Sequence, residues 1–134
     1  MSDCLFCQIA SGALAAEIVH RDDEAVAFLD KYPAARGHVV VIPTRHAANL
    51  LELDDAALGG FFRAVKTVMR KVNDALHPLA MNVGWNHGKD AGQHVFHLHV
   101  HVLPRFSPGR GVQQVGEGTG RVSFAELGAA IRGA

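Results

Sequence analysis

The sequence has few cysteines, no excess charge of either sign and no long apolar run. Its two cysteines, Cys4 and Cys7, are too few and too close together for a disulfide scaffold. No apolar run approaches the roughly 18 residues that span a bilayer, and no charged start precedes a long apolar stretch. We therefore expect a cytoplasmic protein with reduced cysteines and no membrane partner.

The charge balance also excludes one class of partner. Thirteen lysines and arginines match thirteen aspartates and glutamates, so the formal net charge is zero. Proteins that hold nucleic acid by bulk charge are strongly basic, so we expect no nucleic-acid partner, whereas small anionic ligands remain open. With 134 residues, 49% of them hydrophobic, the chain fits one domain over 1–134. Its core is expected over about 4–106, followed by a glycine-rich segment and a short C-terminal helix over 107–134.

Histidine is abundant, and three of the nine alternate with apolar residues at His97, His99 and His101. Side chains two apart on a strand point the same way, so residues 93–105 predict a strand with an imidazole face. The opposite, apolar face comprises Phe96, Leu98, Val100 and Val102. Neighbouring imidazoles would lie roughly 6.6 Å apart, which fits one phosphate or one metal. Solvated surface histidines are the less favoured alternative, because all three titrate near neutrality.

Hydrophobic periodicity, turn residues and capping residues predict the other elements. The predicted helices cover residues 4–11, about 55–77 and a short segment after the capping box at 123–126, and the predicted strands cover 17–20, 25–29, 38–42 and 80–85. This order predicts an α+β fold with about five strands in a mostly antiparallel sheet. One long helix and short terminal helices would pack on it.

The histidine alternation, preceded by Ala91-Gly92-Gln93, resembles the signature of the histidine-triad (HIT) superfamily of nucleotidyl hydrolases and transferases. Further blocks recur in that family's order, and together with the triad they cover residues 4–106: Leu29-Asp30 with Pro33, residues 37–43, His46 and Asn86. The triad block is a highly specific signal. The other blocks are weak alone and strong in combination, so a HIT-like fold is expected.

The resemblance implies a nucleotidyl hydrolase that forms a nucleotidyl-histidine intermediate at His99. Its neutral imidazole would attack the α-phosphorus of a nucleoside phosphoramidate or dinucleoside polyphosphate, and water would release the nucleoside monophosphate. Purine is the usual base in the family. A backbone carbonyl that accepts the Nδ1 proton would direct Nε2 at phosphorus. Protonated His101 would neutralise the phosphoryl charge or protonate the leaving group, with His97 and His38 in support. Histidine rather than glutamine at the third triad position favours hydrolysis over uridylyl transfer.

The resemblance also implies substrate contacts, each with a simpler structural alternative. Asp30 would bind ribose hydroxyls or cap a turn. Phosphate oxygens would meet the loop that contains Gly88 and Gly92, whose backbone donors suit anions. The remaining implied contacts are Asn86, Gln93 and His94 near the phosphates, and Leu5, Phe6, Ile9 and Phe28 around the base, where the alternative for the apolar set is core packing.

Cys4 and Cys7 would share one face of the first helix, as buried thiols or as metal ligands. A zinc-bearing branch of the family implies that His46 and His97 complete the ligand set. Two thiolates and two imidazoles make a closed tetrahedral site of the structural type, with one zinc per chain. The chemical step would then require no metal.

Two other functions are alternatives to the nucleotidyl hydrolase. In the first rival, a metallohydrolase, His97, His99 and His101 would bind a catalytic zinc. In the second, a nucleotide-binding interaction module would hydrolyse only incidentally. The resemblance further implies a homodimer joined through the long helix and the late strands.

Overall fold

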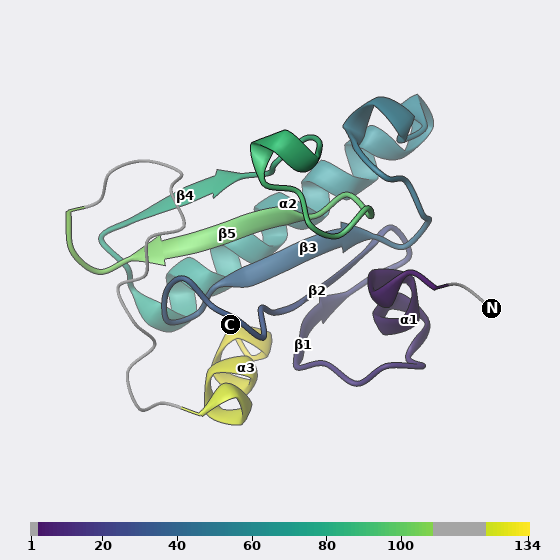
Figure 1. Ribbon diagram of the computed structural model, residues 1–134. Helices are drawn as coiled ribbons and strands as arrows, with labels where there is room; N and C mark the ends of the chain where they lie inside the picture. The colour runs from purple at the N-terminus through teal and green to yellow at the C-terminus, as the bar shows by residue number, and fades with distance from the viewer. Residues whose placement is uncertain (1–2, 109–122) are drawn as a thin grey trace.

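The computed structural model describes residues 3–108 and 123–134, and its centre is one five-stranded sheet (Figure 1). The strands lie in the order β1-β2-β3-β5-β4, and every neighbouring pair is antiparallel. Their bounds are β1 Ile18–Arg21, β2 Ala25–Leu29, β3 Val39–Pro43, β4 Ala80–Gly84 and β5 Val100–Arg105. The expected α+β fold is confirmed.

Local sequence signals explain where the helices begin and end. Helix α2, Asp55–Leu76, starts at Asp54, whose side chain accepts the Ala56 N–H, and it ends at His77 in the left-handed region just before Pro78. Helix α3, Phe124–Arg132, starts at Ser123, whose hydroxyl accepts the Glu126 N–H. Helix α1, Leu5–Ser11, ends at Gly12 with φ 86°. The glycine-rich segment predicted before α3 lies largely outside the described residues.

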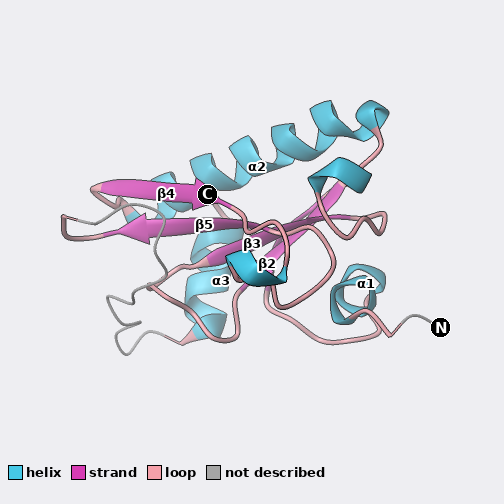
Figure 2. Cartoon of the chain, turned by 45° about the horizontal axis from the view of Figure 1, so that its top comes forward, coloured by secondary structure: helices cyan, strands magenta, loops and turns pink. Residues whose placement is uncertain are grey.

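The sheet is covered differently on its two faces, because alternate residues of each strand point to opposite sides. Ala25, Ala27 and Leu29 pack in the main core with the apolar stripe of α2 and with Leu127 and Ile131 of α3. Val26 and Phe28 instead pack against Ile9 and Ala10 of α1. Figure 2 shows α2 and α1 on opposite sides of the sheet. The two faces of the sheet are thus packed against different helices.

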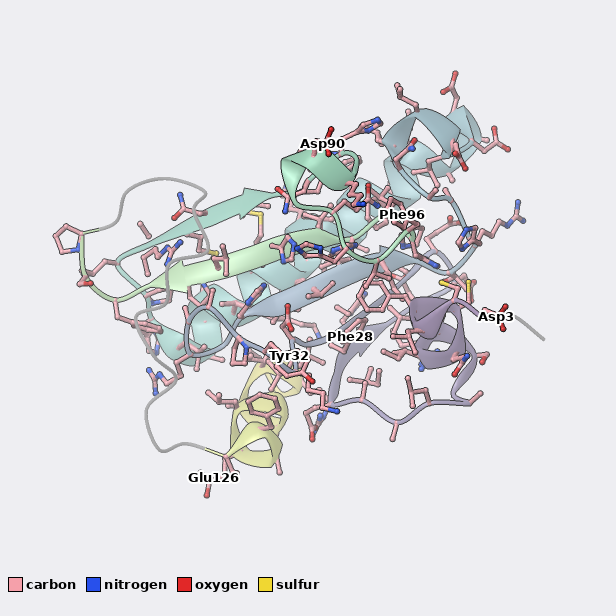
Figure 3. The ribbon with its side chains drawn as sticks, in the orientation of Figure 1. Asp3, Phe28, Tyr32, Asp90, Phe96 and Glu126 are labelled. Atoms are coloured by element: carbon pink, nitrogen blue, oxygen red, sulfur yellow. The ribbon has the colours of Figure 1, made fainter. Side chains whose placement is uncertain are left out.

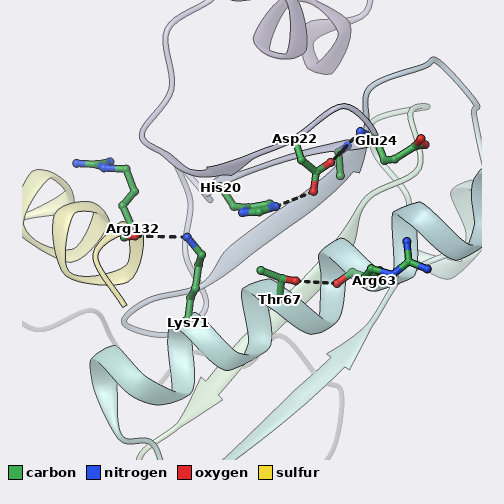
Figure 4. A network of polar contacts seen from close by, with 8 residues as sticks. His20, Asp22, Glu24, Arg63, Thr67, Lys71 and Arg132 are labelled. Carbon is green, nitrogen blue, oxygen red and sulfur yellow. Dashed lines mark hydrogen bonds and ion pairs between the residues drawn. The ribbon is translucent and has the colours of Figure 1, made fainter.

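Polar contacts fix the turn before β2 and the end of α3 (Figure 4). Asp22 accepts the backbone N–H groups of Glu24 and Ala25 at 2.8 and 2.9 Å, and its other oxygen meets His20 Nε2 at 2.8 Å. Lys71 of α2 donates to the carbonyl of Arg132 at 3.3 Å. These bonds hold the β1-β2 hairpin closed and α3 beside α2.

The triad strand is shorter than predicted. β5 begins only at Val100, so His97 and His99 precede the strand and are not paired in the sheet. The backbone N–H of Leu98 donates to Ala47 O at 2.7 Å, which takes this segment out of the ladder. Leu98, Val100 and Val102 are buried as expected, but Phe96 is 51% exposed and does not belong to a core face. Among the described residues, no helix combines the length and apolar character needed to cross a bilayer.

Candidate functional site

Four histidines gather on the α1 side of the sheet. His38 directly precedes β3, and His101 in β5 pairs with Val40 of β3, so adjacent strands hold these two side by side. The His99 and His101 rings lie 5.1 Å apart, as do the His38 and His101 rings. The four histidines are all buried: His38, His97, His99 and His101. The sheet thus brings the predicted imidazoles together even though only His101 lies within a strand.

Hydrogen bonding determines which nitrogen of His99 carries the proton. Its Nδ1 lies 2.8 Å from the His97 carbonyl oxygen. A carbonyl only accepts, so Nδ1–H donates and the lone pair of the neutral ring lies on Nε2. Burial lowers the pKa of His99, against the opposing effects of this hydrogen bond and the Asp30 charge. The ring is therefore neutral near pH 7, with Nε2 available as a nucleophile.

A second chain of bonds determines the tautomer of His101. The Ala34 N–H donates to His38 Nδ1 at 3.0 Å, so the proton of neutral His38 lies on Nε2. That Nε2–H donates to His101 Nδ1 at 2.9 Å, which leaves the His101 proton on Nε2. Burial first, then nearby charges, lower the pKa of both rings to about 4. The lowered pKa favours the neutral form of His101 near pH 7, with its proton on Nε2.

Asp30 lies where β2 leaves the sheet. One carboxylate oxygen accepts the Tyr32 N–H at 2.9 Å, so the turn role considered as an alternative is present. The other lies 3.6 Å from His38 Nε2. The carboxylate is partly exposed, which leaves it accessible beside the histidines.

An apolar cluster adjoins His99. Phe6 of α1 packs edge-on against Phe28 at 5.4 Å and against His99 at 5.0 Å between ring centroids. Ile9 is buried in the same cluster, whereas Leu5 is half-exposed. Figure 3 shows Phe28 on the side of the sheet that carries α1. Three of the four residues expected around a base therefore meet in one cluster next to the candidate nucleophile.

The loop before the histidines contains two left-handed glycines, Gly88 and Gly92. Gly92 approaches the side chain of Asn86 so closely that an added Cβ would lie 3.4 Å from Nδ2. His94 is exposed. Asn86 and Gly92 are thus neighbours, as a shared contact to one phosphate would require.

Gln93 differs from its expected role. Its Nε2 donates to Ala48 O at 2.7 Å and to Val95 O at 3.0 Å, and its Oε1 accepts the Gly88 N–H at 2.8 Å. Both amide protons are used and the side chain is buried, so no side-chain donor remains for a phosphate oxygen. Gln93 ties two loops together instead.

Cys4, Cys7, His46 and His97 form a possible metal centre. Their ligand atoms lie within 4.8 Å of one another. Zinc bonds of about 2.3 Å to sulfur and about 2.1 Å to nitrogen put tetrahedral ligand atoms roughly 3.3–3.8 Å apart. The observed distances are 3.3 Å from His97 Nδ1 to each Sγ and 3.3 Å from His46 Nδ1 to Cys7 Sγ. The residues fit zinc.

The orientation of His97 supports that fit. Its Nε2–H donates to the Pro43 carbonyl at 2.9 Å, which leaves the Nδ1 lone pair facing the two sulfurs. Burial lowers the pKa of His97 to about 4, so this lone pair is unprotonated near pH 7. With two thiols and two imidazoles as donors, the centre has the closed ligand set of a structural site.

In the described residues the triad histidines do not converge on one common metal position. Within the described residues, no ligand group contains His97, His99 and His101 together. A second group, Asp30, His38 and His101, lies close enough for a metal. In this group, His38 Nε2 donates a hydrogen bond to His101 Nδ1.

The sequence predicted a backbone carbonyl at His99 Nδ1, but not the residues whose backbone groups orient the site. The groups that orient His38, His97 and His99 are the backbone N–H of Ala34 and the backbone carbonyls of Pro43 and His97. Any residue supplies these groups, so composition carries no signal of them.

Comparisons with known proteins agree on one family. The family model named HIT domain matches residues 11–108. The Bacillus subtilis protein named Protein hit is 38% identical over 109 residues, 81% of this chain and 75% of that protein. A Schizosaccharomyces pombe adenosine 5'-monophosphoramidase is 37% identical over 102 residues, 76% of this chain and 74% of that protein. The crystal structure of a Zn-bound histidine triad family protein from Mycobacterium smegmatis superposes with a TM-score of 0.82 at 31% identity, covering 98% of this chain and 91% of that one.

Proposed function

The chain belongs to the HIT-domain family, and on that basis we propose that it hydrolyses nucleoside phosphoramidates or dinucleoside polyphosphates at the α-phosphate. The proposal carries over from the relative named as a monophosphoramidase. Its main support within this chain is the hydrogen bond from His99 Nδ1 to His97 O at 2.8 Å. That bond leaves Nε2 as a neutral nucleophile that needs no separate base.

The reaction takes two displacements at phosphorus. His99 Nε2 attacks the α-phosphorus, the Nε2–P bond forms, and the P–N or P–O bond to the leaving group breaks while that group takes up a proton from solvent. Water then attacks the same phosphorus, the Nε2–P bond breaks, and nucleoside monophosphate leaves as the attacking water releases a proton to solvent. His101 donates a hydrogen bond from Nε2 to a non-bridging oxygen, where negative charge increases in the transition state.

Substrate binding follows from what surrounds His99. The base would pack against the apolar cluster of Phe6, Ile9 and Phe28, and exposed Leu5 would add a contact. Asp30 accepts a hydrogen bond from a ribose hydroxyl through its accessible oxygen. Asn86 and the backbone at Gly92 hold phosphate oxygens, and exposed His94 lies on the leaving-group side. The metal centre stabilises the fold and takes no part in the bond-making steps.

The proposed assembly is a homodimer. β4 is an edge strand, and beside it lies a groove lined by Met69 and Asn73 of α2 and by Leu79 and Met81. Leu79 is largely exposed in the single chain. A two-fold contact through β4 and α2 would cover this apolar edge, and light scattering would detect the dimer.

A substrate panel tests the proposed activity. Adenosine and guanosine phosphoramidates would be compared with dinucleoside polyphosphates under steady-state conditions. We expect turnover with release of nucleoside monophosphate on at least one class. Saturable binding with negligible turnover on both would contradict hydrolysis and favour the nucleotide-binding module.

A further inference from the structure

The tautomer of His99 depends on a carbonyl that the sheet does not fix. The acceptor for its Nδ1–H is the His97 oxygen, and β5 begins three residues later at Val100. The β3-β5 ladder pairs Val100, His101 and Val102 only. Some other interaction must therefore orient the peptide between His97 and Leu98.

That peptide is held at both ends. Its carbonyl accepts from His99 at 2.8 Å, and its N–H donates to Ala47 O at 2.7 Å. In a trans peptide the two groups point in opposite directions, so fixing the N–H fixes the carbonyl. Ala47 directly follows His46, which is a member of the possible metal centre.

The side chain of His97 provides the second restraint. It is fully buried, its Nε2–H donates to Pro43 O, and its Nδ1 faces Cys4 and Cys7 at 3.3 Å. The His46 ring packs edge-on against it with centroids 5.0 Å apart. A metal bound by these four ligands would therefore hold His97 through its side chain and His46 next to Ala47.

Helix α1 gives a further contact to His99. Cys4 caps this helix, Cys7 lies within it, and Phe6 between them packs edge-on against the His99 ring at 5.0 Å. Anchoring both cysteines on a metal would restrain Phe6 as well. The backbone contact to His99 thus comes from a metal-centre residue, and the aromatic contact comes from Phe6, which lies between two of them.

We propose that the Cys4–Cys7–His46–His97 centre positions the nucleophile, because metal binding fixes the His97–Leu98 peptide whose carbonyl keeps the His99 proton on Nδ1. His97 is then a positioning residue that couples the metal to His99. Without the metal, neither the His97 side chain nor His46, next to Ala47, is held by a metal bond. The His97–Leu98 peptide is then less restrained, and His99 samples the tautomer whose Nε2 is protonated and not nucleophilic. The effect on rate rests on the proposed function, whereas the effect on the tautomer does not.

The test uses the full chain labelled with ¹⁵N in its imidazoles, with zinc bound and after chelation. Two-bond ¹H–¹⁵N spectra distinguish a protonated Nδ1 from a protonated Nε2. We expect zinc-bound protein to show His99 wholly as the Nδ1–H form. In folded zinc-free protein both nitrogens should shift toward an averaged value, and adduct formation should slow by about tenfold or more.

Three variants distinguish the loss of a zinc ligand from a general loss of fold as the cause of a change in the His99 tautomer. His46→Asn removes the ligand attached to Ala47 and should mix the His99 tautomers even if chelated parent protein unfolds. His46→Cys restores a zinc ligand and should restore the single tautomer. His77→Asn makes the same chemical change at the end of α2, where asparagine also accepts the left-handed backbone, and should change nothing.

The outcomes separate this inference from the proposed activity. An unchanged His99 spectrum in folded zinc-free protein and in folded His46→Asn would overturn the coupling while leaving hydrolysis intact. Zinc-dependent tautomers without any nucleotide adduct would support the coupling and contradict the proposed function. A purely structural zinc would lower the melting temperature and leave the tautomer unchanged, which also overturns the coupling.

Discussion

His38 donates its Nε2 proton to His101 Nδ1 at 2.9 Å, and the Ala34 N–H at His38 Nδ1 fixes the direction of that bond. A buried ring that follows β2 thus determines which nitrogen of His101 carries a proton. The same arrangement places His38 at the centre of the site without requiring it to touch substrate.

Replacing His38 should therefore change both stability and turnover. His38→Leu removes the hydrogen bond from the Ala34 N–H and the one to His101 Nδ1, and losing a buried hydrogen bond of this kind costs about 1–3 kcal/mol. His38→Gln keeps an amide donor that can reach His101. We expect turnover of His38→Leu to fall about tenfold further than that of His38→Gln. Equal turnover in the two variants, measured on folded protein, would contradict the tautomer argument.

Acid should unfold the protein partly through the same pair. Burial lowers the pKa of His38 to about 4, whereas an unfolded histidine titrates near 6.5. Between these values the unfolded chain binds a proton that the folded chain does not, so stability falls as pH decreases from about 6.5 to 4. The loss approaches about 3 kcal/mol for His38. Below about pH 4 this contribution stops changing.

Urea unfolding as a function of pH measures this loss. Chelator would be present throughout, so that zinc release does not contribute. The free energy of unfolding of His38→Gln should depend less on pH between 6.5 and 4 than that of the parent. Parallel pH profiles would show that His38 does not remain neutral in the folded protein.

Zinc content and helix capping can be separated at Cys4. Its sulfur faces His97 Nδ1 and also accepts the Cys7 N–H at the start of α1. Both Cys4→Ser and Cys4→Ala should abolish the expected one zinc per chain, but serine keeps the cap, which is worth about 1 kcal/mol. Cys4→Ala should therefore have the lower melting temperature of the two. Metal analysis that finds zinc retained in both variants would disprove the ligand assignment.

Gln93 should matter for folding more than for phosphate binding. Gln93→Glu removes both donors to Ala48 and Val95 and places a carboxylate beside their carbonyls. We expect a loss of stability of about 2–4 kcal/mol. Nucleotide affinity, measured by calorimetry on the folded fraction, should change much less than stability. A large loss of affinity at unchanged stability would instead support the phosphate contact expected from sequence.

The elements that were predictable from sequence are those with local signals. The stripe of α2 between Asp54 and Pro78 and the capping box at Ser123 both identify helices from adjacent residues. The His97 segment is different, because histidine alternation predicts a strand whereas distant groups determine its backbone. Ala47, 51 residues earlier by sequence number, takes the Leu98 N–H out of the sheet.

The site was predictable as a set of residues but not as a set of bonds. Cys4, Cys7, His46 and His97 do meet, as the family resemblance implied. The neutral state of His101 was not predictable, because it depends on burial and on the direction of its bond with His38. Residue type fixes neither of these properties.

During turnover, His99 Nε2 should become covalently bonded to phosphorus. Zinc-bound protein would be mixed with a nucleoside phosphoramidate labelled on its α-phosphate and quenched without acid, under single-turnover conditions. We expect labelled protein whose nucleotide maps to His99, and His99→Ala should form none and lose turnover by on the order of a thousandfold. Product formation at the parent rate with no labelled protein, or turnover of His99→Ala within tenfold of the parent, would contradict the account.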